Sequence, residues 1–204
     1  TMEGETVEWM KKVSRENGIV LTGSLMIEEA GNYYNRLVWM LPNGQYGHYD
    51  KRHLFAFGEE DKHYSPGNKR LIASVKGWKI NLQVCYDLRF PVWARQQNTE
   101  TGAEYDLLIY VANWPERRSH AWKTLLCARA IENQCYVVGV NRVGSDGKNV
   151  YHSGNSLVID PLGQVLYHMA DEEDVNTITL QKEMLEDVRN KFPFWKDADT
   201  FNIQ

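Results

Sequence analysis

The chain has 204 residues, of which 43% are hydrophobic and 25% are charged, so its length and composition fit one globular domain with a substantial core. The net charge of -4 and the pI near 5.9 disfavour a surface that binds nucleic acid or another polyanion. No apolar run approaches the ~18–20 residues of a membrane-spanning helix, which disfavours a membrane partner. Three cysteines are too few for a disulfide framework and favour a reducing, cytoplasmic setting.

The first part of the chain predicts one helix followed by short strands. Apolar residues at helical spacing predict a helix over residues 6–17, and Gly18 is its stop signal. Strands are predicted over residues 19–25, 34–41, 46–51, 71–75 and 78–84. Lys76-Gly77 predicts a tight turn that joins the last two strands into a hairpin, and residues 52–68 are expected to be irregular.

The second part predicts further strands and two more helices. Buried strands are expected over residues 106–112 and 136–140, a hairpin over 157–167 and a last strand over 177–180. Helices are expected over 119–134 and 182–191, the first with an inner face of Trp122, Leu125, Leu126, Ala130 and Ile131. The aromatic tail, residues 192–204, is expected to pack on the body or on a partner chain. Strands and helices intermix, so we predict a single α/β domain with a mixed sheet.

Cys85 ends the strand predicted over residues 78–84. The following residues 92–97 have helical character, so the cysteine stands at a strand-to-helix corner. A thiol on such an elbow lies at the rim of the sheet, with the next backbone N–H groups directed at whatever the sulfur attacks. The alternative is a buried cysteine that only fills space, as most cysteines in globular proteins do.

Charged and aromatic residues at other strand ends are candidate partners of this thiol. Lys51 is either a surface lysine or an ammonium that favours the thiolate and stabilises an oxyanion. Glu59-Glu60 is either a solvated acidic loop or supplies a carboxylate that orients Lys51 or helps to transfer protons. Asn113-Trp114 either paves a pocket or plugs the core. A metal site built from histidines also stays open, and its candidate residues are His53, His63, His120, His152 and His168.

Four motifs resemble the nitrilase, or carbon–nitrogen hydrolase, superfamily in their order and spacing. They are Asp50-Lys-Arg-His-Leu-Phe55, Val84-Cys-Tyr-Asp-Leu-Arg-Phe-Pro91, Ala112-Asn-Trp-Pro115 and Ala128-Arg-Ala-Ile-Glu-Asn133. The longer runs around these motifs most resemble the bacterial omega-amidases, enzymes that hydrolyse 2-oxoglutaramate and 2-oxosuccinamate to the acid and ammonia. The resemblance covers nearly the whole chain.

The resemblance implies a four-layer α-β-β-α sandwich that dimerises through its helical face. It implies Cys85 as the nucleophile, Lys51 as the catalytic lysine and Glu60 as the second carboxylate, with Glu59 as the fallback. The backbone N–H of Tyr86 would join Lys51 in the oxyanion hole. The reaction runs through a cysteine thioester and needs no metal or organic cofactor.

A 2-oxo-dicarboxylate monoamide carries a free carboxylate, so its pocket needs a cation. Arg117 or Arg118, which follow Asn113-Trp114, are the first candidates for this role, and Arg89 in the cysteine motif is the second. Asn113 and Trp114 themselves are expected to contact the substrate.

One part of the family pattern is not found in this sequence. The general-base glutamate of the family lies in an N-terminal Leu-Pro-Glu-Met-Phe-like strand, and the first residues here resemble the helix that follows that strand. We therefore expect the 204 residues to be part of a longer protein that also has the first strand, first helix and second strand. The shorter chain would be a weakened catalyst with a damaged sheet.

Other functions stay open. An aliphatic amidase, a carbamoylase or a nitrilase would share the same three residues and differ in the pocket. A non-catalytic binding protein would have an inert Cys85. A cysteine protease would need a histidine partner, for which the sequence gives no supporting motif.

Overall fold

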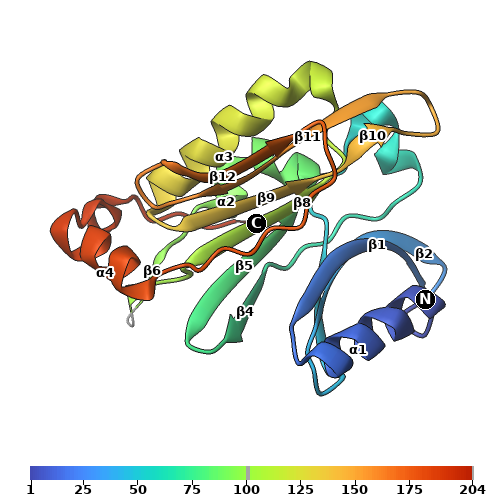
Figure 1. Cartoon of the computed structure of the whole chain (residues 1–204), viewed down its shortest axis with the longest axis horizontal. Coiled ribbons are helices and arrows are strands. Elements are labelled where there is room, and N and C mark those ends of the chain that lie inside the picture. The colour runs from blue at the N-terminus through green and yellow to red at the C-terminus, as the bar shows by residue number, and fades with distance from the viewer. Residues whose placement is uncertain (100–101, 204) are drawn as a thin grey trace.

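The computed structural model describes residues 1–99 and 102–203, and it places two sheets between two helical layers (Figure 1). The first helix, α1 (Glu5–Asn17), packs on a three-stranded antiparallel sheet of β1 (Leu21–Glu29), β2 (Asn32–Met40) and β3 (Tyr46–Asp50). The long helix α3 (Ser119–Asn133) covers the outer face of a larger sheet. The layers follow the predicted α-β-β-α order.

The larger sheet has seven strands in the order β10-β11-β9-β8-β5-β4, with β12 paired to β11. Its strands are β4 (Leu71–Val75), β5 (Trp78–Val84), β8 (Leu107–Ala112), β9 (Tyr136–Asn141), β10 (Val143–Ser145), β11 (Tyr151–Ile159) and β12 (Val165–Ala170). β5, β8 and β9 run parallel, whereas β4, β11 and β12 pair antiparallel, which confirms the mixed sheet. The carboxyl ends of the three parallel strands therefore lie along one edge of the sheet.

Short elements complete the chain. They are the helices α2 (Pro91–Ala94) and α4 (Lys182–Lys191), the strand pair β6 (Asn98–Thr99) and β7 (Gly102–Ala103), and five 3-10 turns: η1 (Ala56–Gly58), η2 (Glu60–Lys62), η3 (Cys85–Arg89), η4 (Glu116–Arg118) and η5 (Phe194–Asp197). The predicted final helix coincides with α4. Across residues 1–99 and 102–203, no helix combines the length and apolar character that crossing a bilayer requires.

The hairpin turn between β4 and β5 forms as predicted. Val75 pairs with Trp78, so the loop has only two residues, and both adopt positive φ angles, 47° at Lys76 and 79° at Gly77. Such angles at both positions match the turn to the twist of its strands, and glycine reaches them without a Cβ clash.

The inner face of α3 differs from the prediction at one position. Trp122, Leu126 and Ala130 are fully buried, but Ile131 is 54% exposed. Successive helical residues are rotated by about 100°, so Ile131 faces away while the stripe continues through buried Arg129 and Asn133. The Arg129 guanidinium donates there to the Leu88 carbonyl at 2.6 Å and to Glu132 Oε1 at 2.9 Å.

Two further predictions are corrected. Residues 177–180 are extended but form no strand, because within the described residues no neighbouring strand edge pairs with them. The helix after Cys85 is α2 alone, shorter than the predicted 92–97, since Arg95 leaves the helical region with φ -59° and ψ 120°. The aromatic tail does pack on the body, where the Gln134 side chain donates to the Phe192 carbonyl at 2.7 Å.

Candidate active site

A cavity of about 400 Å³ opens at the carboxyl ends of β5 and β8. The predicted site residues lie far apart in the sequence, yet all nine line this one cavity. They are Lys51, Glu60, Cys85, Tyr86, Arg89, Asn113, Trp114, Arg117 and Arg118. Because parallel strands end at the same edge, the segments after β5 and β8 meet here, and the loop after β3 closes the third side.

The elbow at Cys85 is tighter than a strand-to-helix corner. β5 ends at Val84, Cys85 has a φ of 47°, and the 3-10 turn Cys85–Arg89 follows directly. A residue with a side chain costs about 1–2 kcal/mol in this left-handed region, so the surrounding structure must hold it there. The half-buried thiol faces the cavity between the two cores of the protein.

Lys51 is buried at the wall of this cavity, so it is not a surface lysine. Only 3% of Lys51 is exposed, and its Nζ lies 2.5 Å from Glu60 Oε2. The same carboxylate accepts hydrogen bonds from the Phe55 backbone N–H at 2.7 Å and from Asn35 Nδ2 at 3.0 Å. Glu60 therefore holds the ammonium in a fixed position.

The neighbouring carboxylate plays no part in this contact. Glu59 is exposed and pairs with Lys62, whose Nζ lies 2.5 Å from Glu59 Oε1 at the surface. Geometry thus selects Glu60 over Glu59 as the partner of Lys51.

The protonation of the cluster follows from burial and charge. Burial raises the pKa of the Cys85 thiol, while the Lys51 ammonium and a backbone hydrogen bond from Asn113 act in the opposite direction. The net pKa of the thiol lies above its ordinary value, contrary to the lowering that a nearby lysine alone predicts. Burial would also raise the pKa of Glu60, but Lys51 and the hydrogen bonds outweigh it and hold that pKa below its ordinary value.

Three arginines give the cavity an excess of positive charge. The Arg118 guanidinium lies 5.1 Å from the centre of the Phe55 ring, and that of Arg89 lies 5.0 Å from the Trp114 ring. Within the described part of the chain, neither these two nor Arg117 forms an ion pair with a carboxylate. Burial and the neighbouring cations lower the pKa of Arg118. This end of the cavity is suited to an anionic ligand.

Trp114 combines the two roles that the sequence left open. It lines the cavity, but it is 97% buried and packs on Trp122 with ring centres 5.5 Å apart. The Asn141 side chain accepts a hydrogen bond from the Trp114 backbone N–H at 2.7 Å and donates one to the Trp114 carbonyl at 2.9 Å. The residue is a core plug whose edge forms a wall of the site.

Sequence reasoning missed one side of the cavity. The hairpin of β10 and β11 contributes Asp146, Lys148, Val150 and His152, and β2 contributes Asn35. Nothing local in the sequence indicates that this hairpin reaches Cys85. The histidines considered for a metal do not gather: no group of three or more His, Cys, Asp or Glu side chains within the described residues could hold an ion.

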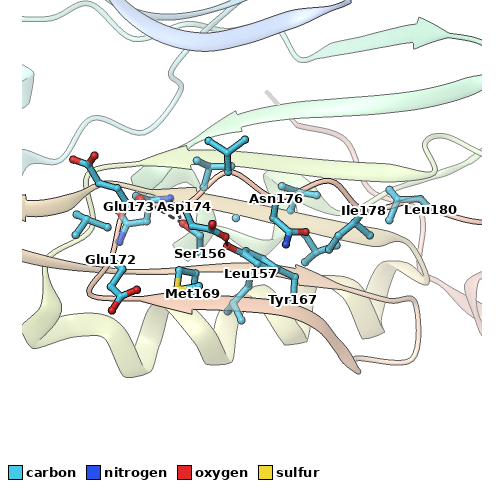
Figure 2. A pocket seen from close by; sticks show the side chains of 17 residues that line it. Ser156, Leu157, Tyr167, Met169, Glu172, Glu173, Asp174, Asn176, Ile178 and Leu180 are labelled. Atoms are coloured by element: carbon cyan, nitrogen blue, oxygen red, sulfur yellow. Dashed lines mark hydrogen bonds between the residues drawn. The ribbon is translucent and has the colours of Figure 1, made fainter.

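A larger hollow of about 580 Å³ lies away from this cluster and shares no residue with it. β9 and β11 form its floor, and the extended segment 172–180 runs along it, with Tyr167 hydrogen-bonded to Asp174 (Figure 2). Val140, on central strand β9, is 50% exposed here. An apolar face of a central strand that is open to solvent is unusual.

Comparison with known proteins gives consistent matches. The carbon-nitrogen hydrolase family model matches residues 1–190. The chain is similar to omega-amidase YafV of Escherichia coli (strain K12), at 44% identity over 203 residues, 98% of this chain and 77% of that protein. It is similar to the 2-oxoglutaramate amidase of Bacillus subtilis (strain 168), at 36% identity over 191 residues, 93% of this chain and 72% of that protein.

A solved structure agrees with these matches. XC1258 from Xanthomonas campestris is a CN-hydrolase superfamily protein whose structure has an arsenic adduct in the active site. It superposes with a TM-score of 0.98 at 45% identity, covering 100% of this chain and 78% of that chain. These findings confirm the resemblance read from the four motifs and the predicted fold class.

Proposed function

The chain belongs to the carbon-nitrogen hydrolase family, and from this premise we propose that it is an omega-amidase. It would hydrolyse the terminal amide of 2-oxoglutaramate or 2-oxosuccinamate to the acid and ammonia. The observation that carries the proposal is one cavity that holds Cys85, the Lys51–Glu60 pair and arginines that have no carboxylate partner among the described residues. The names of the E. coli and B. subtilis relatives support the same substrate class.

The proposed reaction proceeds through a thioester at Cys85. The sulfur attacks the amide carbon, and the Lys51 ammonium and the Tyr86 backbone N–H stabilise the oxyanion of the tetrahedral intermediate. The C–N bond breaks, the thiol proton leaves with ammonia, and water then cleaves the thioester to release the acid and restore the thiol. Glu60 positions Lys51 throughout.

Glu60 is a poor candidate for the base that takes the thiol proton. Its carboxylate already accepts three hydrogen bonds, from Lys51, Phe55 and Asn35, and its pKa is held low. We propose that the base is a glutamate outside these 204 residues, as the family pattern implies. Such a base would have to shuttle a proton between sulfur, leaving ammonia and water.

Arg118 is the arginine that we propose binds the substrate carboxylate. It is half-buried, whereas Arg117 and Arg89 are exposed, so less side-chain freedom is lost when Arg118 binds a ligand. A planar guanidinium also matches a carboxylate with two parallel hydrogen bonds. Asn113 and Trp114 would form the adjoining walls.

The hollow beside residues 172–180 supports a proposal about the rest of the protein. Strands outside these 204 residues would cover the exposed face of β9 and pair with the unpaired segment 177–180. Hydrogen exchange on full-length protein tests this: the amides of residues 177–180 are expected to be protected there, and rapid exchange would contradict it.

We also propose that the protein is a cytoplasmic homodimer that associates through its helical face. Ile131, Val92 and Leu162 are exposed apolar side chains, two of them on the helices α3 and α2. All three cysteines are free, which suits a reducing compartment. Sedimentation of full-length protein tests the dimer, and Ile131→Glu is expected to dissociate it.

Ammonia release from 2-oxoglutaramate by full-length protein tests the function. Wild type should be active, and Cys85→Ala should fall to background, a loss on the order of 10⁶-fold for a nucleophile. Undiminished activity in the alanine variant would overturn the mechanism. A panel of simple amides, N-carbamoyl amino acids and nitriles separates omega-amidase from the other chemistries of the family. Absence of turnover together with an unreactive Cys85 would favour a binding protein.

A further inference from the structure

Asp87 lies two residues after Cys85 and is fully buried, yet it does not line the cavity. Its carboxylate makes four contacts with three residues of two separate segments. Oδ2 accepts from the Tyr49 hydroxyl at 2.7 Å and from the Val84 backbone N–H at 3.0 Å. Oδ1 lies 2.9 Å from both the backbone N and the ring Nδ1 of His53. A buried carboxylate with this many partners is costly to disturb.

The positions of these partners matter more than their number. Tyr49 and His53 stand two residues before and two residues after Lys51, so Asp87 is bonded on both sides of the buried lysine. Val84 immediately precedes Cys85, so the same carboxylate also fixes the start of the elbow. One group thus connects the loop that carries Lys51 to the turn that carries Cys85.

A second ring of contacts stiffens this connection. The Tyr49 hydroxyl accepts from Trp93 Nε1 at 2.9 Å and from the Arg52 backbone N–H at 3.1 Å. The His53 ring stacks on Phe90 with centres 3.9 Å apart. Each member is held by at least one further neighbour, as precise placement of reacting groups requires.

We propose that Asp87 is a positioning residue that sets the separation of the Lys51 ammonium and the Cys85 thiol. The expected effect on kcat rests on the proposed function. The expected effect on the reactivity of the Cys85 thiol does not. Asp87 touches neither sulfur nor substrate space, so it acts only through the two segments that it joins. This positioning role explains why an aspartate stands two residues after the cysteine of the elbow.

Asp87→Asn tests the proposal with little change of shape. An amide replaces one acceptor oxygen by a donor NH2, so two of the four donors lose their acceptor. We expect kcat on 2-oxoglutaramate to fall about 10- to 100-fold with KM nearly unchanged, because small displacements of reacting groups have effects of this size. The readout independent of substrate is the pH midpoint of Cys85 alkylation by iodoacetamide in full-length protein.

The direction of that midpoint separates two explanations. The negative charge of Asp87 raises the pKa of the Cys85 thiol, so if charge alone mattered, its removal would move the midpoint to lower pH. Lys51 lowers the same pKa more strongly, so displacement of the ammonium moves the midpoint to higher pH. We expect the upward shift; a downward shift or none would overturn the proposal, whether or not the protein hydrolyses 2-oxoglutaramate.

Two further variants guard against a trivial loss of folding. Tyr49→Phe leaves the Asp87 carboxylate in place but removes one of its donors, and it also removes the acceptor of Trp93 Nε1 and of the Arg52 backbone N–H. We expect a shift in the same direction with an about three- to tenfold lower kcat. Asp106→Asn is the matched control, since Asp106 is also buried and multiply bonded but lies at the other end of β5 and β8. It should destabilise the protein without moving the alkylation midpoint; an equal shift there would contradict a local role for Asp87.

Discussion

The two ends of the β5–β8 strand pair differ in whether their cationic side chains have carboxylate partners. At the amino end, Asp106 is buried and accepts hydrogen bonds from the Lys79 backbone N–H at 3.0 Å, from Arg189 at 3.0 Å and from Lys182. These bonds fasten α4 to the sheet, and Lys182 and Arg189 both pair with Asp106. At the carboxyl end, Arg89 and Arg118 stand in the cavity without a carboxylate partner among the described residues.

The difference teaches where function lies in this sheet. Paired charge fixes α4 at Asp106 and the position of Lys51 in the cavity, whereas the cavity arginines without a carboxylate partner among the described residues are suited to a ligand. Asp106 is six residues before Ala112, which lies at the level of the elbow, so the ends are about 20 Å apart at a strand rise of ~3.3 Å per residue. Changes at the two ends should therefore act independently.

The largest effect is expected at Lys51. Lys51→Met should lower kcat by about 10²–10³-fold, because it removes an oxyanion donor. It should also raise the pKa of the Cys85 thiol further, since the ammonium opposes the effect of burial, so alkylation by iodoacetamide should need higher pH. Lys182→Met, the lysine of the opposite end, serves as the control. Equal losses of kcat in both variants would contradict the separation of function and structure between the two ends of the strand pair.

Next in size is the loss of stability at Asp106. Asp106→Asn should lower the free energy of unfolding by about 2–3 kcal/mol at pH 7, since it leaves the partly buried cations Lys182 and Arg189 without their carboxylate. Burial would raise the pKa of Asp106, but Lys182 and its other partners lower it below the ordinary value. The carboxylate therefore stabilises the fold above the unfolded-state pKa of about 3.9, and this contribution is lost as pH falls through the lower folded-state pKa.

Denaturant unfolding of wild type and Asp106→Asn across pH measures this effect. The gap between the two proteins should be constant above about pH 5 and should close at lower pH. The kcat of the folded variant should stay unchanged. A gap that widens in acid would show that the aspartate is not the charged partner described here.

A smaller effect is expected at Arg118. Arg118→Met should lower kcat/KM for 2-oxoglutaramate by about 30-fold or more, chiefly through KM, because the substrate carboxylate loses its partner. Activity on a simple uncharged amide and the melting temperature should change little. Arg117→Met is the matched control at the adjacent, exposed position, and a larger loss there would transfer the role to Arg117.

The smallest effect is expected at Glu59, which pairs with Lys62 at the surface. Glu59→Gln should leave both kcat and stability unchanged within error, since exposed ion pairs contribute little. Glu60→Gln, one residue later, should lower kcat strongly, because Lys51 loses the carboxylate that positions it. Parallel measurement of the two variants by ammonia release decides between the adjacent carboxylates.

Local signals in the sequence predicted most of this fold. Lys76-Gly77 supports its own turn, and the boundaries of α4 follow from apolar spacing alone. The prediction of a strand over residues 177–180 was wrong, because a strand forms only where a neighbouring strand edge pairs with it. The sequence pattern does not show whether such an edge is present. The prediction that Ile131 is buried was wrong because the buried stripe continues through Arg129, whose guanidinium pairs with Glu132 and donates to the distant Leu88 carbonyl.

The candidate site divides in the same way. Cys85, Lys51 and Glu60 could be named because they stand in recognisable motifs at strand ends. Asn35 and His152 could not, since they reach the cavity only through the pairing of β2 and of β10 with β11. The contacts of Asp87 join residues 34 and 38 positions apart in the chain, which no local pattern reveals.

The left-handed backbone of Cys85 has a consequence for how such a protein could lose its activity. At a φ of 47°, glycine is the residue that the main chain itself prefers, and any side chain adds about 1–2 kcal/mol of strain. Cys85→Gly should therefore be more stable than Cys85→Ala, although both lack the nucleophile. Drift to glycine would relax the fold, so a cysteine persists at this corner only while selection acts on its sulfur.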